Sequence, residues 1–171
     1  MLWCFMLAII AGACGIPAEI SSVRQEIRRV EKEFAPDRRV AVFKVDTMLA
    51  GNPPVLLGET NLSQARTSLL SGLEAKGIKF IDSLQLLPAA MLGGRHHGIV
   101  TVSVCNLRSQ PRHAAELSTQ ALMGTSLRVL KKENGFYLVQ TPDDYLGWLD
   151  GGGFLLMDSM QHRQWMRAAH L

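Results

Sequence analysis

The stretch from Gly98 to Asp158 reads GIVTVSVCNLRSQPRHAAELSTQALMGTSLRVLKKENGFYLVQTPDDYLGWLDGGGFLLMD, and it decides the fold of the C-terminal half of the chain. Hydrophobic residues alternate along it with the period of two that is typical of β-strands. The alternating positions are Val100, Val102 and Val104, then Leu127 and Val129, then Tyr137 and Val139. Clusters of turn-forming residues separate these runs at 109–111, 132–135 and 142–144. The pattern predicts a small all-β barrel of short strands.

A series of motifs within this stretch resembles a bacterial SH3-like domain. The motifs are Asn106-Leu107-Arg108-Ser109-x-Pro111, Glu116-Leu117-x-Thr119-Gln120, Gly124-Thr125, Tyr137-x-Val139 and Tyr145-x-Gly147-Trp148. Their order and spacing resemble the SH3-like module that precedes the catalytic domain in NlpC-type cell-wall cysteine peptidases, which cut γ-D-glutamyl-diamino-acid bonds in peptidoglycan stem peptides. The Asp-Cys-Ser-Gly pattern of that catalytic domain does not occur in the sequence. We therefore expect this chain to be non-catalytic.

The resemblance implies a ligand and the residues that would bind it. In the first SH3-like module of these peptidases, an acidic residue and a tyrosine meet the free amine of the stem peptide's N-terminal L-alanine. Glu116 matches the acidic residue and Tyr145 matches the tyrosine, although Glu116 could equally be a solvated loop residue and Tyr145 could merely pack. Trp148 either packs in the core or stacks on a ligand. Arg108 either pairs with a ligand carboxylate or braces its own loop.

The region 20–88 predicts a second, smaller domain. Residues 20–34 carry apolar side chains every three or four positions, which is typical of an amphipathic helix. A strand is predicted at 39–49, where Val40, Val42 and Val45 alternate. Residues 55–60 are predicted to be the antiparallel partner of that strand, and a third strand is predicted at 79–87.

A second helix is predicted between the last two of these strands. Asn61 is its expected cap, with Gln64 in a capping-box arrangement, and Gly77 is its expected end. The resulting order, α-β-β-α-β, resembles the BON-type α/β sandwich of bacterial envelope proteins, which implies two helices on one face of a three-stranded sheet. We expect an architectural role for it, because it shows no phosphate-binding loop or metal-ligand spacing.

Two shorter segments flank the barrel. Residues 89–98 are predicted to be a linker, and His96 and His97 within it are read as linker histidines because no other metal ligand lies at a suitable spacing. Residues 159–171 are predicted to be a C-terminal helix, with Ser159 as its expected cap, or the beginning of a linker to a further domain. No metal or cofactor is predicted.

Residues 1–19 resemble a secretory signal with a lipoprotein cleavage site. The run MLWCFMLAIIAGA is apolar and uncharged, and it is too short to span a bilayer. Ala11-Gly12-Ala13-Cys14 resembles a lipobox, which implies lipidation of Cys14. A simple secretory signal or a buried N-terminal segment are the alternatives. Either kind of signal implies an extracytoplasmic protein, and the lipobox implies a periplasmic or outer-membrane lipoprotein. Cys105, within an apolar run, is then expected to be a reduced core cysteine.

Composition and motifs together favour a binding protein of the α+β class. The chain has 47% hydrophobic and 19% charged residues, which is typical of a globular protein, and its net charge of +3 is mild. The favoured hypothesis is a recognition and targeting module for peptidoglycan stem peptides, in a lipid-anchored peptidase with a possible C-terminal catalytic domain and no nucleic-acid partner. The alternative is an envelope protein-protein interaction or scaffold domain. A complete enzyme is disfavoured because no nucleophile-base pair is visible.

Overall fold

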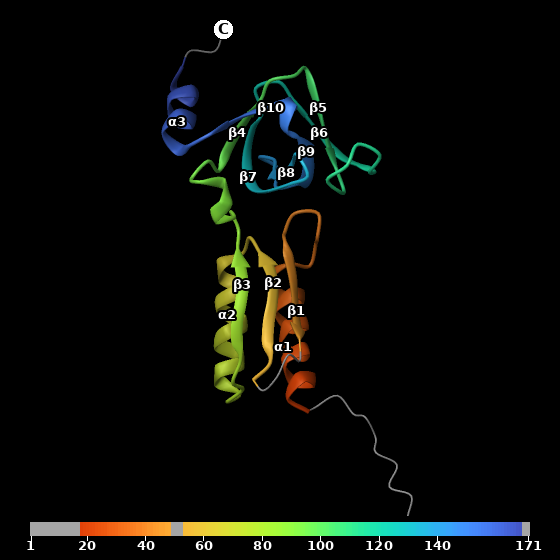
Figure 1. Cartoon of the computed structure of the whole chain (residues 1–171), viewed down its shortest axis with the longest axis vertical. Helices are drawn as coiled ribbons and strands as arrows, with labels where there is room; N and C mark the ends of the chain where they lie inside the picture. The colour runs from red at the N-terminus through yellow and green to blue at the C-terminus, as the bar shows by residue number, and fades with distance from the viewer. Residues whose placement is uncertain (1–17, 49–52, 169–171) are drawn as a thin grey trace, which may run out of the picture.

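The computed structural model describes residues 18–48 and 53–168, and within them the chain has a mixed α+β fold with two separate sheets (Figure 1). The predicted signal and the lipidation site at Cys14 lie outside the described residues. None of the helices in the described ranges is long and apolar enough to cross a membrane.

The N-terminal part has the predicted order α-β-β-α-β. Its β2 strand pairs antiparallel with β1 and parallel with β3, so β2 is central. Both helices cover the same face of this sheet (Figure 1). The elements are α1 (Ala18–Phe34), β1 (Phe43–Met48), β2 (Val55–Thr60), α2 (Ser63–Ala75) and β3 (Ile81–Leu86). The resemblance to the BON type stays a prediction.

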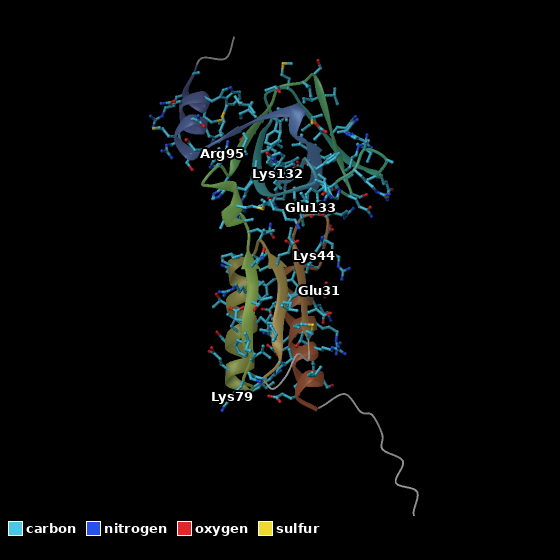
Figure 2. All side chains as sticks on the ribbon, in the orientation of Figure 1. Glu31, Lys44, Lys79, Arg95, Lys132 and Glu133 are labelled. Atoms are coloured by element: carbon cyan, nitrogen blue, oxygen red, sulfur yellow. The ribbon has the colours of Figure 1, made fainter. Side chains whose placement is uncertain are left out.

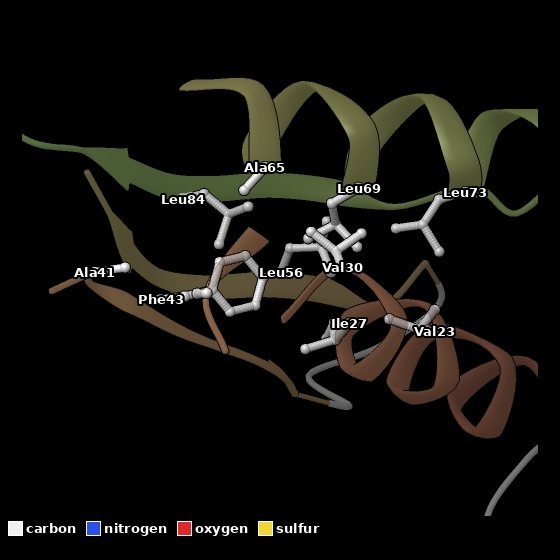
Figure 3. Close-up of a cluster of buried hydrophobic side chains, with 11 residues drawn as sticks. Val23, Ile27, Val30, Ala41, Phe43, Leu56, Ala65, Leu69, Leu73 and Leu84 are labelled. Carbon is white, nitrogen blue, oxygen red and sulfur yellow. The ribbon is translucent and has the colours of Figure 1, made fainter. Parts of the chain in front are cut away.

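The core of this part lies between the helices and the sheet (Figure 3). Ala65, Leu69 and Leu73 are the buried positions of α2, and they recur every four residues, as expected for one face of a helix. The end of α2 is also as predicted: Gly77 has a φ of +68° and its N–H donates to Glu74 O at 2.9 Å.

Two local predictions in this part were wrong. Asn61 is not the cap of α2, because its Oδ1 accepts the N–H of Val42 at 2.9 Å and Leu62 occupies the cap position instead. The first strand begins at Phe43 rather than at residue 39, because residues 38–40 form a turn that Asp37 closes by accepting the N–H of Arg39 at 2.9 Å.

The C-terminal part is an SH3-like β region whose paired strands are all antiparallel. The strand order is β10-β4-β7-β8-β9-β5-β6, and in the described chain the two outer strands do not pair, so the barrel is not closed. The strands are β4 (His97–Val100), β5 (Val104–Arg108), β6 (Leu117–Leu122), β7 (Ser126–Glu133), β8 (Phe136–Gln140), β9 (Leu146–Asp150) and β10 (Phe154–Met157).

Shorter elements complete this part. A 3-10 turn, η1 (Ala90–Leu92), and the start of β4 fall inside the segment 89–98 that was predicted to be a linker. A second turn, η2 (Gly151–Gly153), connects β9 to β10. The terminal helix α3 (Ser159–Arg167) begins one residue after its cap, Asp158, whose Oδ1 accepts the N–H groups of Met160 and Gln161 at 2.8 Å each. The predicted cap at Ser159 was therefore wrong by one position.

The alternation expected at Val100, Val102 and Val104 was also wrong. Val100 is buried in β4, but Val102 and Val104 are 37% and 48% exposed. The chain leaves one strand after Val100 and enters the next at Val104, so the pattern does not continue across the gap, and Cys105 and Leu107 point into the core instead. Burial raises the pKa of the Cys105 thiol, as expected for a core cysteine.

Candidate functional site

The two parts of the chain meet at a shared apolar cluster. Val42 and Leu87 come from the N-terminal part, and they pack with residues of β7, β8 and β9. The C-terminal partners are Leu130, Phe136, Leu138 and Trp148. Figure 1 shows why these residues can meet: the loop between α1 and β1 and the end of β3 lie at the end of the first sheet that faces the SH3-like part.

Polar contacts fix the same junction. The N–H of Leu146 donates to the carbonyl of Arg39 at 2.7 Å, and Gln140 Nε2 donates to the carbonyl of Val40 at 2.9 Å. Lys131 Nζ lies 2.7 Å from Glu59 Oε1, and the two side chains are only 17% and 16% exposed. A half-buried ion pair of this kind holds the two parts in one orientation more firmly than a solvated pair would.

A pocket of about 790 Å³ opens beside this junction, and both parts line it. The volume lies within the range of small-molecule sites, which is roughly 300–1,000 Å³. Its SH3-like wall includes all four residues for which the sequence predicted ligand contacts, Arg108, Glu116, Tyr145 and Trp148. Its other wall comes from Glu31 of α1, from the loop before β1 and from β1 itself, and includes Arg38, Arg39, Lys44 and Asp46.

Trp148 forms an apolar part of this pocket and also belongs to the shared cluster. The side chain is 6% exposed, so core packing accounts for most of its surface. Lys131 Nζ lies 5.3 Å from the centroid of its ring, which adds a cation-π contact to the ion pair with Glu59. Trp148 therefore links the pocket to the contact between the two parts.

Arg108 lies at the end of β5, where its backbone pairs with that of Trp148. Its Nη1 donates to the carbonyl of Ala115 at 2.8 Å, which braces the loop between β5 and β6. The N–H of Ser109 donates to the carbonyl of Glu116 at 2.9 Å and closes the same loop. The guanidinium has further donors, so bracing the loop and pairing with a ligand are compatible roles.

Glu116 is the last residue of this braced loop, and its side chain is exposed at the pocket. No Lys or Arg of the described chain forms an ion pair with its carboxylate. The loop thus presents an anion that is free to meet a ligand cation. The geometry places Glu116 at the pocket.

Tyr145 lies half-buried on the loop between β8 and β9. Its carbonyl accepts hydrogen bonds from the N–H and the hydroxyl of Thr141 at 2.9 and 3.1 Å. Asp144, with a φ of +68°, makes the turn that allows this closure. These contacts hold the backbone of Tyr145 in place at the edge of the pocket.

The pocket residues of the N-terminal part were not predicted to lie in a site. Two of the cations are already paired: Arg39 with Asp37 at 2.7 Å and Arg38 with Glu31 at 2.7 Å. The hydrogen bonds from Arg39 lower the pKa of Asp37 to about 2. Periodicity along the sequence does not say which ends of two domains will meet, so no signal in the sequence marked these residues.

The histidines of the predicted linker do not line this pocket. His97 is in β4 and stacks on His162 of α3 with the ring centroids 4.4 Å apart. In residues 18–48 and 53–168, no group of three or more His, Cys, Asp or Glu side chains is placed to hold a metal ion.

Comparison with known protein families finds a match for part of the chain. The family described as the bacterial dipeptidyl-peptidase SH3 domain matches residues 107–152, a segment that contains Arg108, Glu116, Tyr145 and Trp148. No curated protein matches the chain. The match identifies this segment as a bacterial SH3 domain of the peptidase-associated type, which supports a module that binds the cell wall or another protein. Such domains are often extracellular or associated with the cell envelope.

Proposed function

We propose that this chain recognises peptidoglycan stem peptides that carry a free N-terminal L-alanine, and that it does so without cleaving them. In this proposal it serves as the targeting part of a lipid-anchored γ-D-glutamyl-diamino-acid endopeptidase of the NlpC type, with catalysis supplied by a separate domain. The observation that carries the proposal is the pocket at the junction, whose wall includes Arg108, Glu116, Tyr145 and Trp148 together. The family match to residues 107–152 supports it.

In this proposal, Glu116 selects peptides with a free N-terminal amine over acetylated ones. Its unpaired carboxylate would bind the ammonium group of L-alanine by a charge-assisted hydrogen bond. An acetylated peptide would leave this carboxylate facing a neutral amide, at the cost of its partial desolvation. The Tyr145 side chain would add a contact at the same end of the peptide, and Arg108 would pair with a carboxylate of the D-glutamyl residue.

The test compares two peptides by isothermal titration calorimetry on the full chain. L-Ala-γ-D-Glu-diaminopimelate is expected to bind about tenfold more tightly than its N-acetylated form, since a hydrogen bond to a charged group contributes about 1.5–3 kcal/mol. Glu116→Gln is expected to remove this difference. Glu74→Gln, an exposed change on α2, serves as the matched control and should preserve it. Equal affinity of the wild-type chain for both peptides, or binding of neither, would refute the proposed function.

The location of the protein is part of the same proposal. We expect the segment 1–19 to direct export and Cys14 to carry a lipid, which would place the chain in the periplasm or at the outer membrane. Metabolic labelling with an alkyne fatty acid should mark the wild-type chain and not Cys14→Ser. Labelling of both would contradict lipidation at this position.

A second candidate function is protein-protein interaction, and the edge strand β6 favours it. Leu122 and the following Met123 are 64% and 61% exposed, and Leu117 on the same strand is also exposed. Apolar side chains beside an unpaired strand edge are typical of surfaces that meet another chain. The double change Leu122→Asp with Met123→Asp should then abolish capture of a stoichiometric envelope partner while leaving the peptide titration unchanged. Capture that survives the double change would count against this surface.

A further inference from the structure

We infer that Lys44 of the N-terminal part binds a carboxylate of the same ligand, so that the complete binding site spans both domains. This inference rests on the proposed function and extends it to a residue outside the SH3 domain. Its starting point is that Lys44 and Glu116 line one pocket and come from different domains.

Lys44 differs from the other pocket cations of its domain in having no carboxylate partner. Arg38 and Arg39 pair with Glu31 and Asp37. In the described chain no ion pair is formed by Lys44, and its side chain is exposed. Its ammonium group is therefore available to a ligand.

The reason that Lys44 is unpaired lies in the junction. In the β1-β2 ladder Lys44 stands directly opposite Glu59, where opposite charges commonly pair. The carboxylate of Glu59 instead accepts from Lys131 Nζ of the SH3-like part, at 2.7 and 3.0 Å. When the two domains dock, Glu59 therefore pairs with Lys131 instead of Lys44. The ammonium group of Lys44 remains without an ion-pair partner at the pocket.

One acidic residue on the same strand opposes the binding of a ligand carboxylate by Lys44. Asp46 lies two positions along β1 on the same face as Lys44, and it also lines the pocket. Its Oδ1 accepts the N–H of Thr47 at 2.7 Å, and the Asp46 carboxylate is not ion-paired with Lys44. Its negative charge should weaken the attraction of the pocket for a carboxylate. Removing this charge should therefore change the affinity in the opposite direction to Lys44→Met.

The charges that remain free in the pocket therefore suit a ligand of mixed charge. Glu116 offers an anion from the SH3 wall, and Lys44 offers a cation from the β1 wall. A short peptide with a free amine and a carboxylate satisfies both. The carboxylate could come from the D-glutamyl residue or from diaminopimelate, and the two sources are separable by amidating each in turn.

The test uses the full chain, the tripeptide L-Ala-γ-D-Glu-diaminopimelate and two analogues, one with the D-glutamyl carboxylate amidated and one with the diaminopimelate carboxylates amidated. Lys44→Met should weaken binding of the tripeptide about fivefold, the upper range for a solvent-accessible ion pair. The loss should shrink for the analogue that lacks the carboxylate bound by Lys44. Asp46→Asn should strengthen binding of the tripeptide, by about twofold.

The matched control is Lys79→Met. Lys79 is exposed in the same domain, and Figure 2 shows it at the end of that domain remote from the junction, whereas Lys44 lies near it. Lys79→Met should leave all affinities unchanged. If wild type still discriminates against the N-acetylated tripeptide but Lys44→Met binds as tightly as wild type, the role of Lys44 is wrong and the proposed function stands. If Lys44→Met lost equal affinity for the tripeptide and for both analogues, the role of Lys44 would also be overturned. If the wild-type chain binds no peptide, both proposals fail together.

Discussion

Gly147 shows how a single residue shapes the wall of the pocket. A Cβ added at this position would lie 2.6 Å from the Cβ of Leu107, which is fully buried. Strand β9 can therefore approach β5 only because residue 147 has no side chain. The Gly-Trp pair that appeared in the sequence as part of an SH3-like motif thus has a steric reason, and Trp148 reaches the junction because of it.

We predict that Gly147→Ala destabilises the chain by about 1–3 kcal/mol, the usual cost of overpacking a core. Urea unfolding followed by circular dichroism should show a lower midpoint with an unchanged slope. Binding of the stem tripeptide should weaken as well, because β9 carries Trp148 and follows Tyr145 directly. A loss of stability below about 0.5 kcal/mol would mean that β5 and β9 separate easily and that the close approach does not matter.

At the scale of single elements, α3 packs on the sheet through partly exposed side chains. It has no buried residues, and one of its links to the sheet is the stacked pair of His97 in β4 and His162. Ser126 Oγ of β7 is hydrogen-bonded to His162 Nε2 at 2.8 Å, and Ser159 Oγ lies 3.3 Å from His97 Nε2. Two imidazole rings in direct contact therefore form part of the docking of the helix.

His97 lies among basic side chains. His97 faces His162 and Arg163 of α3, Arg128 of β7 and its neighbour His96. Burial lowers the pKa of His97 below 6.5, and the charges of these groups lower it further. The docked helix thus favours neutral His97, and its contribution to stability is fully present above about pH 6.5 and is lost as the pH falls through the lowered pKa.

We predict that α3 detaches in mild acid while the β region stays folded. Hydrogen exchange should show protected α3 amides at about pH 7.5 and a selective loss of this protection at about pH 5, relative to β7 and β8. Replacing His97 by Phe keeps an aromatic ring and removes the titrating group, so it should reduce this pH dependence. Equal protection of α3 at the two pH values would contradict the prediction.

The same elements show what sequence patterns could and could not predict. Periodicity predicted α1 and the strands β7 and β8, because each buries one face against its own core, whereas it was wrong from Val100 to Val104, where the chain passes from one strand to the next. It failed where a side chain serves a contact outside its element: Asn61 binds Val42 instead of capping α2, and Val42 faces the SH3-like part while Phe43 faces the N-terminal core. The SH3 wall of the pocket was predictable from motifs, whereas the β1 wall depends on docking between domains, which leaves no periodic signal.

At the scale of the whole molecule, the junction couples two domains that could each have folded around its own core. The shared cluster, the Lys131–Glu59 pair and the hydrogen bonds to the carbonyls of Arg39 and Val40 all cross it. Because the pocket lies beside these contacts, a ligand that touches both walls should bind only the docked arrangement. Ligand binding and domain docking are then linked, and the ligand should stabilise the whole chain rather than one half.

We predict that residues 18–168 unfold as one cooperative unit and that Val42→Asp divides the transition in two. Val42 is 5% exposed in the shared cluster, so a carboxylate there would lack a partner and should cost about 3 kcal/mol or more at the junction. Differential scanning calorimetry should show one peak for the wild type, with equal calorimetric and van't Hoff enthalpies, and two peaks for the variant. Val104→Asp is the matched control, because Val104 is exposed on β5 and the change should keep a single peak. Two peaks in the wild-type chain would show that the domains are independent, and the site across the junction would then lack the fixed geometry on which Lys44 and Glu116 depend.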